Sequence, residues 1–429
     1  MGPSQREYGR MVGLESVWFE CPVGADTKVS RALSRLPAAH PMERDRPVPR
    51  DGEEVAETRY FLRAGAGSIF PVTVRMVRYR PLPLATDPSA PAPAVRVRVG
   101  LSGQDCAEAT LMRVAHTLVS AGLPLGPACE DQDLWRRTAA DRWPAVKADR
   151  VAAPSARGDH LVAAIAGQLA LNRMAVLEGD RQTGVHQSRV ALRRLRSLLP
   201  ILRPLLPEPM SESLAYHART LAAALGPARD WDVFVTESVP PVRAAADDLV
   251  GWSALLDSAE ERRAAAAEAA RRAMRGPVLA ALAVELAFAA RALALAEADL
   301  TNALWRRIRK RARALATLGP GLAELPDDDR HEVRKNLKKI RYLIEFAQNN
   351  PDSPRVSGFL SDVAVLQDKL GLLNDGAVVH GLVRTVGAET PAAGAVVGWH
   401  AHAARRALPA LATPWTRLIS TRLPRVSGA

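Results

Sequence analysis

The sequence predicts a mainly α-helical protein with a smaller α+β domain at its N-terminus. Three observations support this fold class. Residues 155–429 are long segments rich in Ala, Leu and Arg, separated by turn residues, which is typical of helices. Residues 1–150 contain Pro-rich breaks and two alternating runs with the period of strands. An internal repeat in the larger part indicates two similar helical bundles related by a pseudo-twofold axis.

In the N-terminal domain we expect strands at 72–80 and 94–102, followed by a helix at 107–123. The three cysteines, Cys21, Cys106 and Cys129, are widely spaced and form no Cys-x-x-Cys pair, which argues against a disulfide framework or a cysteine zinc site. The N-terminus has no apolar signal core. The apolar run at 277–296 is interrupted by Glu285 and Arg291, so we interpret it as a soluble helix and expect no membrane partner.

The charge of the chain indicates a polyanionic partner. Its 429 residues carry a formal net charge of +12, and most of the excess lies after residue 150. Nucleic acid, an acidic membrane surface and a phosphate polymer all fit such a charge. A solvated, arginine-rich surface is the alternative at this point.

Two basic helical segments repeat at a fixed offset. VHQSRVALRRLRSLL at 185–199 matches RHEVRKNLKKIRYLI at 330–344 after a shift of 145 residues. The same shift aligns LGPARDWDVF at 225–234 with LGLLNDGAVV at 370–379. VGW at 250–252 recurs at 397–399, with the offset slipped by two. Three motifs in one order indicate an internal duplication.

At 100° per residue, each segment has a basic stripe beside an apolar band. In the first copy the stripe is His186, Arg189, Arg193, Arg196 and Arg203, beside Leu192, Leu195, Leu198, Leu199 and Leu202. In the second it is His331, Arg334, Lys338 and Arg341, beside Leu337, Ile340, Leu343 and Ile344. Arg194 and Lys339 fall off the stripes, towards solvent or a neighbouring helix. Two facing stripes would create a positive cleft suited to a flexible phosphate chain; routine surface salt bridges are the alternative.

The expected helix starts place both histidines near unpaired backbone amides. Asp329 with Glu332 three residues later fits a capping box, and Thr183 gives a weaker N-cap signal. His186 and His331 would then lie in the first helical turn, where the helix dipole favours an anion.

These motifs, with LQDKLGLLND at 366–375, resemble the CHAD family, the conserved histidine α-helical domain, over roughly residues 157–429. The resemblance implies two four-helix bundles around a basic central cavity, with copies at about 157–275 and 300–429. It also implies binding of inorganic polyphosphate and association with polyphosphate granules. The binding residues carried over by position are His186, Arg189, Arg193, Arg194, Arg196, His331, Arg334, Lys338, Lys339 and Arg341.

The resemblance also assigns an acidic position after each Leu-Gly turn. Asp230 and Asp375 occupy it, and we expect them to orient nearby arginines or histidines rather than touch an anion. The second copy has Asn374 where the first has Arg229, which puts a symmetric role for Arg229 in doubt.

CHAD domains often follow a CYTH domain, a triphosphate-hydrolysing tunnel with a metal-binding Glu-x-Glu-x-Lys strand. Here Glu15 and Glu20 are five positions apart and no lysine follows in register. Residues 1–150 are therefore at most a degenerate, non-catalytic CYTH-like domain. Arginines on its strand-like runs either line an anion site or are simply exposed; they are Arg75, Arg78, Arg80, Arg96 and Arg98.

We therefore expect a non-enzymatic, cytoplasmic polyphosphate-binding protein, on polyphosphate granules and in contact with other proteins there. We expect no catalytic residue, cofactor or metal site: the histidines of HAH at 400–402 would point apart on a helix, and RDWD at 229–232 fits a salt bridge. RNA or DNA backbone binding ranks second, because aromatics make up only 5% of the chain. A CYTH-type triphosphatase is the other alternative.

Overall fold

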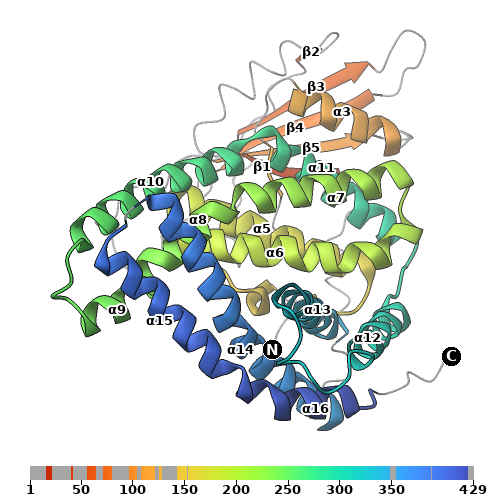
Figure 1. The fold of residues 1–429 in the computed structure, drawn as a ribbon. Helices are drawn as coiled ribbons and strands as arrows, with labels where there is room; N and C mark the ends of the chain where they lie inside the picture. Colours follow the sequence, from red (N-terminus) through yellow and green to blue (C-terminus); the bar gives the residue numbers. More distant parts are fainter. Residues whose placement is uncertain are drawn as a thin grey trace, which may run out of the picture.

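The computed structural model of the chain (Figure 1) describes residues 16–21, 40–41, 56–63, 71–79, 96–103, 108–120, 125–127, 143–151, 153–347, 354–387 and 389–423. A small antiparallel sheet lies at one side of a larger helical body. The predicted mainly α-helical fold class is confirmed.

The sheet has five strands in the order β1-β5-β4-β3-β2. Their bounds are β1 Ser16–Cys21, β2 His40–Pro41, β3 Ala56–Arg63, β4 Pro71–Tyr79 and β5 Arg96–Gly103. The strands expected at 72–80 and 94–102 are β4 and β5, and the expected helix is α3, Glu108–Ser120. Phe19, Val99 and Leu101 are buried where α3 and the long helix α11, Pro277–Leu295, pack on the sheet.

The two interpretations of the strand arginines, an anion site or simple exposure, both stay predictions. Arg75 and Arg78 lie on β4, and Arg96 and Arg98 lie on β5. Arg80 lies outside the described residues.

The helical body repeats one order of helices. The first copy comprises α5 Gly158–Glu178, α6 Arg181–Leu202, α7 Glu208–Ala224, α8 Gly226–Val233, a π-helical turn at Phe234–Ser238, α9 Val239–Ala245 and α10 Trp252–Arg275. The second comprises α12 Thr301–Ala316, α13 Asp327–Phe346, α14 Pro354–Val386, α15 Pro391–Ala407 and α16 Ala412–Ser420. A shift of 145 residues places α5 on α12 and α6 on α13, and the nearly continuous run α7–α9 on the single helix α14. Short 3-10 turns lie at Ala148–Val151, Arg203–Leu205 and Pro409–Leu411.

The predicted apolar bands of α6 and α13 form part of the core. All five leucines of the first band are buried, as are the four residues of the second. Two helices in the described part of the chain, α5 and α11, are long and apolar enough to cross a membrane, and most of each is buried inside the protein. Packing against neighbouring helices therefore accounts for their composition.

The predicted helix starts are wrong. Helix α6 begins at Arg181, and its N-cap Asp180 accepts a hydrogen bond from the Thr183 amide at 3.2 Å. Helix α13 begins at Asp327 after Pro326, without a side-chain cap. His186 and His331 therefore lie in the second turn, away from the free amides of the first.

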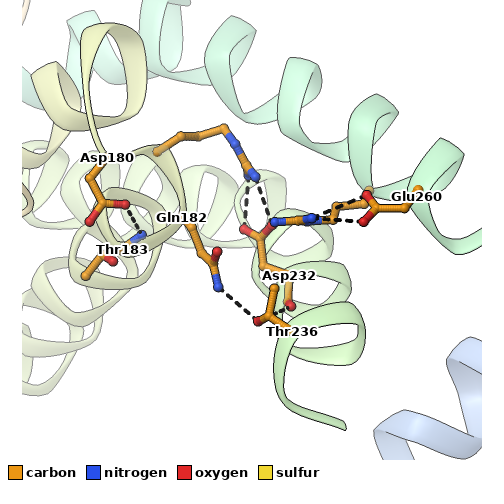
Figure 2. Close-up of polar contacts among 8 residues, drawn as sticks. Asp180, Gln182, Thr183, Asp232, Thr236 and Glu260 are labelled. Atoms are coloured by element: carbon orange, nitrogen blue, oxygen red, sulfur yellow. Dashed lines mark hydrogen bonds and ion pairs between the residues drawn. The ribbon is translucent and has the colours of Figure 1, made fainter. Parts of the chain in front are cut away.

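The start of α6 is tied to α8 and α10 by a buried carboxylate (Figure 2). Arg181 donates two hydrogen bonds to Asp232, at 2.9 and 3.0 Å, and Arg263 of α10 donates a third at 2.8 Å. Asp232 is fully buried, so this pairing compensates its desolvated charge. Gln182 of α6 also donates to Thr236 in the π-helical turn, at 3.1 Å. These contacts fix the helix that carries the first basic stripe.

Candidate functional site: a basic cluster shared by both copies

The two helices that carry the basic stripes, α6 and α13, pack against each other in the middle of the helical body (Figure 1). Their contact brings cations of both copies together. We call six of these residues the central basic cluster: His186, Arg189, Arg193, Arg229, Arg334 and Lys338.

His186 shows that the two copies meet electrostatically. Burial, followed by the charges of four neighbours, lowers its pKa to about 4. Those neighbours are Arg229, Arg193, Arg189 and Lys338. The first three belong to its own copy, and Lys338 belongs to the other. At neutral pH the imidazole is therefore uncharged and can still donate one hydrogen bond.

Lys338 of the second copy likewise shows that charges of the two copies act on each other. Burial first, and then the charges of Arg334 and Arg193, lowers its pKa to about 7, while Asp375 acts in the opposite direction. A lysine amine with such a pKa is half-charged at neutral pH. A nearby anion would restore the charge, since it offsets the repulsion that removes it.

Two guanidinium groups of the cluster have buried donors without acceptors. The Nε atoms of Arg193 and Arg334 are buried and have no hydrogen-bond partner among the residues that the structure describes. Within the same residues, neither arginine takes part in an ion pair within 4.0 Å. By contrast, Arg189 donates to the Ala222 carbonyl at 3.1 Å. Buried donors are normally satisfied, so these two arginines, which also form no ion pair, carry charge that no close anion of the described residues compensates.

The two predicted supporting aspartates lie at this cluster. Burial raises the pKa of Asp230, Arg189 and Arg229 lower it, and Asp375 of the other copy raises it further. The equivalent carboxylates thus approach each other where the copies meet. Among the described residues, neither aspartate accepts a hydrogen bond from an arginine or a histidine; their interaction with the cluster is through charge, and the supporting role stays a prediction.

Arg229 belongs to the cluster although it was not among the predicted binding residues. It forms an ion pair with Glu237 at 3.1 Å and lowers the pKa of His186. The repeat did not single it out, because its counterpart is Asn374. Its position beside Asp230 in the repeated LGPARDWDVF motif was the only sequence signal.

Two of the predicted residues are occupied by contacts within the protein. Arg194 is 4% exposed, donates to Gln168 Oε1 at 2.7 Å and lies 4.9 Å from the Phe346 ring centroid. It packs between helices instead of facing solvent or an anion. Arg341 pairs with Glu345 at 3.2 Å and donates to Gln367 at 3.0 Å.

The remaining predicted residues lie outside the central cluster. His331 is exposed on α13, so the two histidines of the repeat have different environments. Arg196 is also exposed, and it lies near Lys339 rather than beside His186. No group of three His, Cys, Asp or Glu side chains placed to hold a metal ion occurs in the part of the chain that the structure describes.

Fold and site together define an internally duplicated helical protein with a basic cluster between its copies. The chain belongs to the CHAD domain family, whose model, described as "CHAD domain", matches residues 160–384. A crystal structure of the CHAD domain from the plant Ricinus communis is similar in fold, with a TM-score of 0.51 and 24% sequence identity; the match covers 66% of this chain and 98% of that one. No curated protein matches the chain. The family match begins after the sheet, so a CYTH-like N-terminal domain stays a hypothesis.

Proposed function

We propose that the CHAD domain binds inorganic polyphosphate at the central basic cluster. The observation that carries this proposal is the approach of Arg193 to Arg334 and Lys338, cations of two copies that repel one another and form no ion pair among the described residues. A ligand with closely spaced negative charges would relieve this repulsion at several points at once. CHAD domains in general are associated with polyphosphate, which supports this ligand.

Polyphosphate fits the site better than a nucleic acid does. A phosphate chain needs only cations and N–H donors, which the cluster supplies. Binding of single-stranded nucleic acid usually adds aromatic stacking platforms. The aromatic groups beside the stripes, Tyr342 and Phe346, are buried, and each lies near an arginine side chain.

Neutralising one cation from each copy tests the proposal. We expect Arg193→Gln with Lys338→Gln to weaken binding of long-chain polyphosphate about a hundredfold, because two charge-assisted contacts are lost. Isothermal titration calorimetry measures the affinity. The matched control is Arg272→Gln with Arg275→Gln, which removes the same charge from the exposed end of α10. Equal affinity of the cluster variant and the wild type would refute the proposed site.

Two further measurements separate the alternatives. If single-stranded RNA displaces polyphosphate at moderate salt, the nucleic-acid function is favoured. If tripolyphosphate incubated with magnesium or manganese releases phosphate, the N-terminal domain is a triphosphatase and the chain is an enzyme.

We also propose that the protein is cytoplasmic and resides on polyphosphate granules, in contact with other proteins there. The support is the proposed ligand itself. Fluorescence microscopy of the tagged chain, with and without the cluster substitutions, tests this: recruitment that depends on Arg193 and Lys338 is expected, and recruitment unchanged by their loss would contradict it.

A further inference from the structure

The two copies differ at the helix that flanks the basic stripe. Helix α5 in the first copy is largely buried, and α11 packs along it. Its counterpart α12 has the sequence TNALWRRIRKRARALA and packs against α13, α6 and α16. At the positions of Val162, a core residue of the first copy, and Ala166, which packs against that core, α12 has Arg307 and Arg311. The second copy has therefore exchanged an apolar contact surface for a charged one.

These arginines form part of a second group of cations, which we call the outer basic patch. It consists of Arg196, Arg307, Arg311, Lys335 and Lys339. Arg307 and Arg311 are one helical turn apart and share a face of α12. The Nε atoms of both are buried and lack a hydrogen-bond partner within the described residues.

The neighbours of the outer basic patch leave most of its charge uncompensated. Arg311 donates to Asn336 Oδ1 at 2.5 Å, and this amide is neutral. Lys335 pairs with Glu332, a carboxylate on the exposed side of α13. No ion pair of Arg196, Arg307, Arg311 or Lys339 occurs in the described ranges. The patch thus carries excess positive charge with few close carboxylate partners, as the central cluster does.

The patch is electrostatically continuous with the central basic cluster. Partial burial, and then the charges of Arg219 and Arg193, lowers the pKa of Arg196. Burial first, and then charges that include Arg311 and Arg196, lowers the pKa of Lys339. Arg196 therefore lies within range of Arg193 in the central cluster and of Lys339 in the patch.

We propose that the outer basic patch is a second phosphate-binding site, which takes a further segment of the polyphosphate chain bound at the central cluster. This inference rests on the proposed function and extends it to chain length. Once one segment is bound, the next is held at a high effective concentration near the patch. Chains long enough to reach both sites then bind more tightly than a short phosphate that contacts the central cluster alone.

The test compares two probes on one variant. We expect Arg307→Gln with Arg311→Gln to weaken binding of size-fractionated long-chain polyphosphate about tenfold and to leave tripolyphosphate unaffected. The slope of log affinity against log salt should become shallower by about 1.4 for the long chain, because two fewer cations release counterions. Arg272→Gln with Arg275→Gln is the control of equal charge and should change neither probe.

Three outcomes would overturn the inference: unchanged long-chain affinity, an equal loss for both probes, or a loss restricted to single-stranded RNA. If the α12 variant does not fold, as judged by circular dichroism, Arg196→Gln with Lys335→Gln probes the exposed part of the same patch. The central-cluster variant distinguishes failure of the second-site inference from failure of the proposed function. If Arg193→Gln with Lys338→Gln abolishes binding of both probes while the patch variants do nothing, only the second site is refuted.

Discussion

Lys338 of the central basic cluster should take up a proton when polyphosphate binds. In the free protein, burial and the charges of Arg334 and Arg193 lower the pKa of this amine from 10.5 to about 7. A bound polyphosphate segment counters those charges and returns the pKa towards its ordinary value. Because the complex then holds more protons than the free protein, affinity should fall as the pH rises above 7.

The size of the effect follows from the two pKa values. If the pKa is about 7 in the free protein and returns to 10.5 in the complex, affinity drops about 25-fold between roughly pH 6.5 and roughly pH 8.5. The slope of log affinity against pH approaches about −1 at the alkaline end, since one proton is then taken up per site. A partial return of the pKa gives a smaller drop of the same sign.

Calorimetric titration with long-chain polyphosphate at several pH values measures this slope. Lys338→Arg is the matched variant, because arginine keeps its charge throughout this range. It should bind with little dependence on pH between 6.5 and 8.5, and more tightly than the wild type at the alkaline end. The terminal phosphates of the polymer also change protonation with pH, but they do so equally in the experiments on the wild type and on Lys338→Arg. Equal slopes for Lys338→Arg and the wild type would refute the assignment of the proton to Lys338.

Three further predictions concern stability. The folded pKa of Lys338 is below its unfolded value, so the unfolded chain binds more protons than the folded one between about pH 7 and 10.5. The free energy of unfolding should therefore rise with pH in this window. Urea unfolding of Lys338→Met should show a smaller rise than urea unfolding of the wild type. Asp232→Ala leaves Arg181 and Arg263 without their shared carboxylate and should lower the free energy of unfolding by about 3–5 kcal/mol in urea, whereas unchanged stability would contradict a structural role. Arg194→Gln should lower it by about 1–3 kcal/mol and leave polyphosphate affinity unchanged in calorimetry; a loss of affinity without a loss of stability would reverse our assignment.

The sequence was sufficient for features that depend on local periodicity. Leu192 and Leu337 are buried as predicted, because a helix that packs on one side must place its apolar residues at helical spacing. The first residues of the helices were harder to predict from the sequence. The segment DDDR offers three adjacent acidic candidates for a cap, and the helix starts at the first of them, where all three favour the N-terminal dipole. The start of α6 was also predicted too late in the sequence, because Asp180 and not Thr183 is the N-cap.

The sequence could not separate members of a repeated basic pair, because their roles depend on a neighbouring helix. Arg194 aligns with Lys339, and each follows a stripe residue by one position. In the first copy Gln168 of α5 accepts a hydrogen bond from Arg194, and the arginine is buried between helices. At the position of Gln168 the second copy has Arg313, which offers no acceptor. Lys339 therefore lacks this partner and lies near Arg311 in the outer basic patch, whereas its duplicate Arg194 became a packing contact.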